Sequence, residues 1–157
     1  MALKVAHPDG WGSDSLTREG QAYLQLQPLW DGVVPRLVAF GLDRKEDSYV
    51  LATRLVSNCR HLSPHTDGHL YPRLRLALEA VHGCGVIHGD LREANILVEE
   101  PRTDDSGCCA GEQGSKMEAD QQAARVWLID FGQAERGATR QQMDDEMREL
   151  AYLMSQR

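Results

Sequence analysis

The strongest indication of the fold lies in the segment 88–97, His-Gly-Asp-Leu-Arg-Glu-Ala-Asn-Ile-Leu. It places a carboxylate at Asp90 and a carboxamide at Asn95, and an apolar run typical of a strand follows directly. A second apolar run, 126–129, ends in another carboxylate, Asp130, which Phe-Gly follows. Two short strands flanked by oxygen-bearing side chains predict one polar site to which both loops contribute.

The composition is typical of a globular protein. With 157 residues, of which 41% are apolar, the chain can form one domain with a buried core. Its net charge of −7 disfavours direct nucleic-acid binding, which needs a basic surface. No apolar run is long enough for a membrane span, and the first residues lack the pattern of a signal peptide. We therefore expect a cytoplasmic protein, with the nucleus as the alternative compartment, that binds neither membranes nor nucleic acid directly.

The cysteines and histidines suggest a metal site only weakly. Four cysteines without framework spacing are expected to be reduced thiols of an intracellular protein: Cys59, Cys84, Cys108 and Cys109. A zinc site would draw on Cys59, His61, His65 and His69. Pro64 would break the helix that aligns them, and the set contains no C-x-x-C pair, so ordinary structural roles are the better interpretation.

Hydrophobic periodicity predicts alternating strands and helices. Strands are expected at 2–6, 36–40, 48–55, 96–98 and 126–129. One helix is expected over 15–29, capped by Ser15 or Thr17 and ended or kinked at Pro28. Another begins near Pro72 and stops at the Gly-Cys-Gly of 83–85. A last helix carries an apolar stripe expected to pack in the core: Met143, Met147, Leu150, Ala151 and Met154.

A polar insertion separates the two short strands. Residues 99–125 contain seven acidic and three basic residues and no aromatic residue. Such a segment can bury little apolar surface, so we expect a solvated, mobile loop.

The order H-x-D-L-x-x-x-N, I-L-V and then L-I-D-F-G resembles the protein-kinase-like superfamily. The likeness extends from Lys4 to Gly132 and is looser beyond. It implies an α+β, two-lobed protein-kinase-like fold that is incomplete, with a partial N-lobe sheet and one helix over 1–55. A shortened helical C-lobe would occupy 56–157, so that 1–157 forms a single domain.

The resemblance also implies roles for residues of both loops. Asp90 matches the catalytic aspartate that orients the acceptor hydroxyl or takes its proton. Arg92 stands where it could neutralise charge on the transferred phosphoryl group. Asn95 and Asp130 match the ligands of Mg²⁺, which prefers hard oxygen donors. His88 matches a buried structural histidine, and Gly132 would give the loop its turning freedom.

A nucleotide-binding set is implied nearer the N-terminus. Ala2 and Lys4 resemble the V-A-I-K strand, in which the lysine binds the α- and β-phosphates of ATP. Glu19 is similar to the glutamate that pairs with this lysine, and Leu97 matches the apolar residue beneath the adenine ring. An ordinary solvated charge is the alternative interpretation of Lys4.

Three departures from the family pattern point toward its small atypical members. Nothing precedes Lys4 that could form the strand pair with the glycine-rich loop, so the domain is expected to be truncated there. Gly89 stands in place of an arginine that usually interacts with a phosphate on the activation loop. Ordering of that loop by phosphorylation is therefore not expected. After Gly132 there is no A-P-E motif, and an acidic helix follows in which Asp144 or Asp145 either anchors the catalytic loop or is simply solvated. This combination resembles the kinase of the tRNA-threonylcarbamoyl-modifying complex and, more distantly, aminoglycoside and choline phosphotransferases.

Two functions follow from the resemblance. The first is an ATP- and Mg²⁺-dependent phosphotransferase, most simply of the serine/threonine protein kinase type. It would transfer the γ-phosphate of ATP to a hydroxyl of a protein or small molecule. The alternative is a catalytically inactive pseudokinase or truncated kinase fragment that acts as a binding module.

Overall fold

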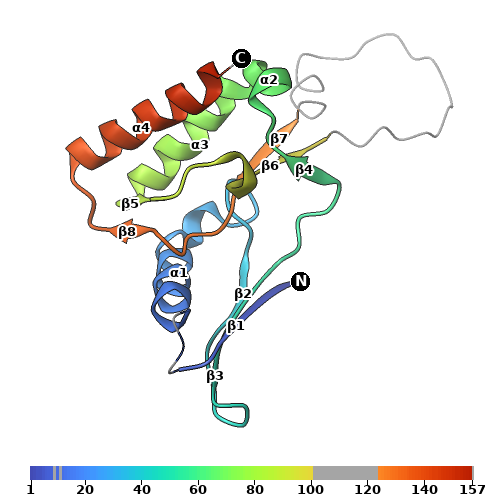
Figure 1. The fold of residues 1–157 in the computed structure, drawn as a ribbon, viewed down its shortest axis with the longest axis vertical. Helices are drawn as coiled ribbons and strands as arrows, with labels where there is room; N and C mark the ends of the chain where they lie inside the picture. Colours follow the sequence, from blue (N-terminus) through green and yellow to red (C-terminus); the bar gives the residue numbers. More distant parts are fainter. Residues whose placement is uncertain (9, 11, 101–123, 157) are drawn as a thin grey trace, which may run out of the picture.

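The computed structural model describes residues 1–8, 10, 12–100 and 124–156, which form the predicted mixture of helices and strands (Figure 1). The strands are β1 (Ala2–Ala6), β2 (Leu37–Asp43), β3 (Ser48–Thr53), β4 (Cys59–His61), β5 (Val86–Ile87), β6 (Ile96–Glu99), β7 (Arg125–Leu128) and β8 (Glu135–Arg136). The helices are α1 (Ser13–Gln25), α2 (Pro64–Asp67), α3 (Tyr71–Gly83) and α4 (Arg140–Ser155), with short 3-10 turns η1 (Gln27–Leu29), η2 (Gly68–Leu70) and η3 (Glu93–Asn95).

The predicted mobile loop over 99–125 lies outside the described residues except at its two ends, as do Cys108 and Cys109. At those ends the boundaries differ from the prediction. Glu99 and Arg125 are paired residues of β6 and β7, so the strands extend further than their apolar residues indicate.

The first sheet is antiparallel in the order β1-β3-β2, and α1 packs against one of its faces (Figure 1). Leu51 of β3 pairs with Lys4 on one side and with Phe40 on the other. Paired residues point to the same face of a sheet, so Lys4 is directed toward α1. The helix approaches the sheet closely at Gly20, where an added Cβ would lie 2.3 Å from the ring of Phe40.

The second sheet, β4-β6-β7, is also antiparallel, and it determines the position of the polar residues. Ile96 and Leu128 are paired and buried, as expected for short apolar strands in a core. Because the strands run in opposite directions, the beginning of β6 lies beside the end of β7. The N–H of Ile129 donates to the carbonyl of Asn95 at 3.0 Å, so Asn95 and Asp130 lie on the same edge of the sheet.

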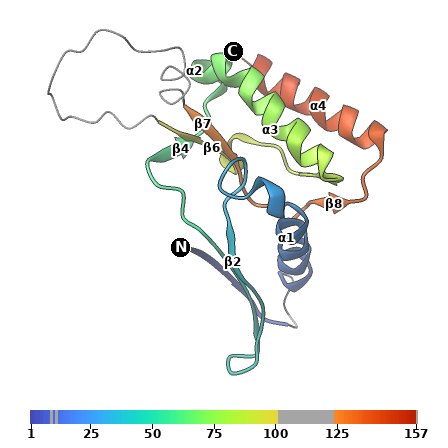
Figure 2. The same cartoon turned by 180° about the vertical axis from the view of Figure 1, so that it is seen from behind.

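The helices α3 and α4 lie side by side, as the views from both sides show (Figure 1, Figure 2). Pro72 stands in the first turn of α3, where a missing N–H costs no helical hydrogen bond. At the start of α4, Thr139 and Gln142 satisfy each other's backbone N–H groups in a capping box. No helix in the described part of the chain is long and apolar enough to cross a membrane.

The first predicted helix differs from expectation at both ends. It ends at Gln25 instead of 29, and Pro28 lies in the separate turn η1, because proline cannot supply an N–H to continue the helix. The prediction that Ser15 or Thr17 caps this helix is wrong, since the N-cap residue is Gly12. The hydroxyl of Ser15 instead donates to a distant carbonyl.

The apolar stripe of α4 belongs only partly to the core. Leu150 and Met154 are buried, and Met143 and Met147 are half-buried. The core prediction is wrong for Ala151, which is exposed. Ala151 follows Leu150 directly and therefore points about 100° away around the helix axis.

The approach of α1 to the sheet generates a prediction. In most helices Gly→Ala is stabilising by about 1 kcal/mol. We expect Gly20→Ala to lower the free energy of unfolding instead, by about 1–3 kcal/mol, because the ring of Phe40 must move. Gly83→Ala is the control, since no atom of the described residues lies within 4 Å of a Cβ placed there. Chemical denaturation measures both variants, and equal stabilisation of the two would contradict the expectation.

Candidate functional site

The loop between β5 and β6 holds a compact group of polar side chains. The Nδ2 atom of Asn95 donates to the backbone oxygen of Asp90 at 2.9 Å and to its Oδ2 atom at 2.8 Å. The Nε atom of Arg92 lies 3.1 Å from the same Oδ2 atom. The structure thus brings Asp90, Arg92 and Asn95 together, and both partners orient the carboxylate of Asp90.

A second group joins residues far apart in sequence, and we call it the Lys4 triad: Lys4, Glu19 and Asp130. The Nζ atom of Lys4 lies 2.8 Å from Oε2 of Glu19 and 2.8 Å from Oδ1 of Asp130. The Glu19 side chain is 3% exposed, whereas those of Lys4 and Asp130 remain partly open to solvent. The triad therefore connects β1, α1 and the end of β7.

The charges of the triad follow from competition between burial and pairing. Burial alone would lower the pKa of Lys4, but hydrogen bonds to Asp130 and Glu19 outweigh it and raise that pKa. Burial alone would raise the pKa of Asp130, but the bond from Lys4 and its charge hold that pKa below the usual range. Burial dominates at Glu19 and raises its pKa. Lys4 and Asp130 are therefore a charged pair at neutral pH.

The backbone at Asp130 has a conformation rarely adopted by residues with side chains. Its φ is 65°, in the left-handed region, which costs of order 1–3 kcal/mol and is common at functional sites. Gly132, which was expected to supply the turning freedom, is not among the glycines with positive φ. A glycine is needed there for a different reason, since an added Cβ would lie 2.5 Å from Oγ of Ser15.

A cavity of about 310 Å³ opens beside the Lys4 triad. Apolar residues from both sheets line most of it, and its polar lining consists of the triad together with Thr53, Arg54 and His61. The lining includes all of the predicted nucleotide-binding residues, together with Asp130: Ala2, Lys4, Glu19 and Leu97. Asp90, Arg92 and Asn95 do not line this cavity, and the Ile129–Asn95 backbone bond connects them to it.

The donor set at this edge suits a hard divalent cation. The Asp130 carboxylate and the Asn95 amide both offer oxygen, and the nitrogen of Asn95 is already engaged by Asp90. In the described residues, no group of three or more His, Cys, Asp or Glu side chains could hold a metal ion. A small cation such as Mg²⁺ would therefore complete its shell with water or phosphate oxygens, as it commonly does.

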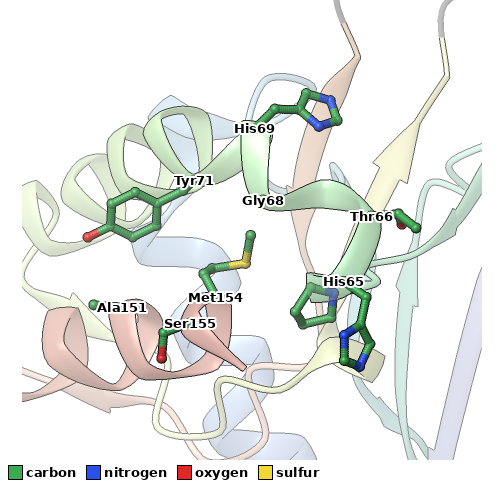
Figure 3. A pocket seen from close by; sticks show the side chains of 9 residues that line it. His65, Thr66, Gly68, His69, Tyr71, Ala151, Met154 and Ser155 are labelled. Carbon is green, nitrogen blue, oxygen red and sulfur yellow. The ribbon is translucent and has the colours of Figure 1, made fainter. Parts of the chain in front are cut away.

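The histidines weighed for zinc lie elsewhere. His65 and His69 line a wide hollow of about 740 Å³ between the α2–η2 turn and the end of α4, where their rings point in different directions (Figure 3). Among the described residues that line this hollow, none carries a carboxylate side chain. His61 and Cys59 belong to β4 and line the smaller cavity instead.

Glu146, which was not predicted as a site residue, fixes the loop before Asp90. Its side chain, 4% exposed, accepts the N–H groups of His88 at 3.1 Å and Gly89 at 2.7 Å. The Nε2 atom of His82 lies 2.7 Å from the same carboxylate. Burial would raise the pKa of Glu146, but these hydrogen bonds outweigh it and lower that pKa.

Two interpretations were left open for Asp144 and Asp145, an anchor for the loop or a solvated surface charge, and the first of them is wrong. Asp144 is exposed, and Asp145 pairs with Arg148 on its own helix. A signal for Glu146 was available in the sequence. It lies four residues before Leu150 and three after Met143, so an acidic residue occurs on the apolar stripe of the helix.

His88 is buried, with 0% exposure, in agreement with the structural role expected of it. Its Nε2 atom lies 2.9 Å from the carbonyl oxygen of Ile129. Its ring packs against the ring of Phe131, with 4.6 Å between the ring centroids. Burial, the dominant effect, lowers the pKa of His88. The residue therefore joins the two loops at their base.

Gly89 has a conformation and a contact that require glycine. Its φ is +76°, and an added Cβ would lie 2.3 Å from the carbonyl oxygen of Gln133. Position 89 therefore cannot carry an arginine without moving the backbone.

Comparison with known proteins identifies a distant, partial similarity. No family model matches the chain. Bud32 subunits of the EKC/KEOPS complex from Aspergillus fumigatus and Aspergillus clavatus are each 35% identical over 88 residues. The matched stretch is 56% of this chain and 28% of each relative, so the chain spans less than a third of the length of these relatives.

The contact at Gly89 can be tested by substitution. We expect Gly89→Ala to destabilise the protein by about 1–3 kcal/mol beyond the strain of positive φ, because the Gln133 carbonyl must move. Gly137→Ala is the matched control, since its φ is +70° and, in the part of the chain that the structure describes, nothing lies within 4 Å of a Cβ there. Urea denaturation gives the difference, and similar losses in the two variants would contradict the steric argument.

The lowered pKa of Glu146 predicts a pH-dependent effect. A carboxylate with a depressed folded pKa stabilises the protein fully above its unfolded value, near 4.5, and less as pH falls through the folded value. We expect Glu146→Gln to lower the free energy of unfolding by about 1.5–3 kcal/mol at neutral pH. The difference from the unmodified chain should shrink below about pH 4.5.

Unfolding by urea across this pH range measures the effect of Glu146→Gln. Glu149→Gln, an exposed neighbour on α4, serves as the control and should change stability little at any pH. A stability difference for Glu146→Gln that stays constant into acid would show that its charge is not responsible.

Proposed function

We propose that this chain is an ATP- and Mg²⁺-dependent phosphotransferase of the small atypical kinase type, built as an incomplete two-lobed protein-kinase-like domain. In this proposal the first sheet and α1 form the N-lobe over 1–55, and the remaining elements form the C-lobe over 56–157. The observation that carries it is the Lys4 triad beside an apolar cavity, at the sheet edge that also holds Asn95. The distant similarity to bud32 subunits supports the same class.

Each part of the site has a role in the proposed reaction. The apolar lining near Leu97 and Ala2 would hold the adenine ring, and Lys4 would bind the α- and β-phosphates. Asn95 and Asp130 would hold Mg²⁺, which offsets phosphate charge when it is bound. Glu19 keeps Lys4 in position through its two short hydrogen bonds.

Phosphoryl transfer then requires an oriented acceptor. The oxygen of the acceptor hydroxyl forms a bond to the γ-phosphorus while the bond to the β–γ bridging oxygen breaks and ADP leaves. Asp90, oriented by Asn95 and Arg92, would accept the hydroxyl proton. Arg92 would neutralise charge on the transferred group. The acceptor would be a hydroxyl of a protein or small molecule.

A binding module without turnover is the second candidate. It is favoured by the open edge of the first sheet, since β1 pairs only with β3 in the part of the chain that the structure describes. If the cavity is open at this edge, bound phosphates are more exposed to water than in a fully covered cavity. Such exposure weakens electrostatic stabilisation of the transition state. As a subunit-like module, the chain would bind partner proteins, as the complex named for its relatives suggests.

Thermal unfolding with Mg-ATP tests the nucleotide site. At 100 times the dissociation constant, a ligand stabilises the folded state by about 2.7 kcal/mol, which should raise the melting temperature by several degrees. We expect Asp130→Ala to lose most of this shift, whereas Asp144→Ala, at an exposed site on α4, should keep it. The proposal fails if Mg-ATP gives no shift, or the same shift in Asp130→Ala.

Transfer of radiolabelled γ-phosphate to a serine-containing peptide or a small alcohol distinguishes the enzyme from the binding module. In an enzyme, Asp90→Ala should lower the rate at least about 100-fold while leaving the Mg-ATP shift in place. A chain that binds Mg-ATP without any transfer would support the binding module.

A further inference from the structure

Two side chains of α1 bind the backbone that follows Asp130. Oγ of Ser15 donates to the carbonyl oxygen of Gly132 at 3.2 Å, and Nη1 of Arg18 donates to the same oxygen at 3.2 Å. The guanidinium of Arg18 also reaches Oε1 of Gln133 at 3.4 Å. These bonds span more than one hundred residues of sequence, so only the fold brings them together. We call the bonds to the Gly132 carbonyl the Gly132 contact.

The Gly132 contact is made two residues after Asp130 in the sequence. The backbone N–H of Gly132 donates to the Asp130 side chain, while its carbonyl accepts from α1. A Cβ at Gly132 would lie 2.5 Å from Oγ of Ser15 and 3.3 Å from Oδ1 of Asp130. The N–H and the carbonyl of Gly132 are therefore both hydrogen-bonded. The orientation of Gly132 determines where its N–H, one donor to the Asp130 carboxylate, points.

The same surface of α1 serves the rest of the Lys4 triad. Glu19 follows Ser15 by one helical turn, binds Lys4, and accepts the backbone N–H of Phe131. On the other side of the segment, the carbonyl of Gln133 packs against Gly89. Gly89 has no side chain that could hold this segment, and Arg18 supplies a guanidinium from α1 instead.

We propose that Ser15 and Arg18 are positioning residues that set the orientation of Asp130 toward the divalent cation by holding the Gly132 carbonyl. This inference rests on the proposed function, because it concerns the metal that would accompany ATP. Removing an interaction that orients a metal ligand commonly costs 10–100-fold in metal affinity. The effect should therefore appear only in the part of nucleotide binding that depends on Mg²⁺.

The test compares ATP binding with Mg²⁺ and with EDTA by isothermal titration calorimetry. The variants are Ser15→Ala, Arg18→Gln and the double substitution, and Arg18→Lys should restore part of the lost affinity because it keeps a charged donor. Gln21→Ala is the matched control, since it removes another hydrogen bond of α1, from Arg136 at 2.6 Å, without touching Gly132. Melting temperatures without ligand report whether each variant folds, and Ser15→Ala removes only a hydroxyl should the double substitution unfold.

The double substitution is expected to weaken ATP binding roughly tenfold or more with Mg²⁺ and less than about twofold with EDTA. Equal losses in both conditions, or losses no larger than those of Gln21→Ala, would overturn the positioning role while leaving the proposed function in place. An unmodified chain whose ATP binding does not respond to Mg²⁺ would overturn the proposed function, and this inference with it.

Discussion

The antiparallel pairing of β6 with β7 is the interaction on which the rest of the site depends. It joins two strands that are separated in sequence by the polar insertion, and its buried residues make it part of the core. The pairing brings Asn95, which precedes one strand, beside Asp130, which follows the other. A slip of one residue in register would turn every side chain of a strand to the opposite face. Burial of Ile96 and Leu128 therefore fixes the register of the pairing. The register in turn fixes the positions of Asn95 and Asp130 at the edge of the sheet.

Around this edge, the ammonium group of Lys4 is shared by two carboxylates. Glu19 of α1 and Asp130, which follows β7, approach it from different directions. Lys4 has a raised pKa and Asp130 a lowered one, so their attraction outweighs the cost of partial burial. Glu19 is more deeply buried, and burial governs its pKa. The Lys4 triad is accordingly a balance between desolvation and pairing, and it couples the position of α1 to that of the loop after β7.

Much of the fold follows from local patterns, and less of the site does. The short, largely apolar segment 2–6 was predicted as a strand and matches β1 to the residue, and the D-L-x-x-x-N and D-F-G signatures indicated Asp90, Asn95 and Asp130 as candidate site residues. The place of Glu146 on the apolar stripe of α4 signals burial but not its partners, which are loop N–H groups far away in sequence. The prediction that Ser15 caps the helix failed because its hydroxyl bonds to the carbonyl of Gly132, which is also far away in sequence. Contacts of this kind depend on tertiary packing, which periodicity does not encode.

The bonds from Glu146 to the loop before Asp90 have a consequence for how the protein opens. The amide protons of His88 and Gly89 are held by a side chain of α4, so they can exchange with solvent only when that carboxylate moves away. Detachment of α4 would break both bonds at once and release the loop. The helix and the loop therefore form one cooperative unit of local unfolding, although more than fifty residues of sequence separate them. The rigidity of the polar loop is thus set by how firmly α4 docks against α3.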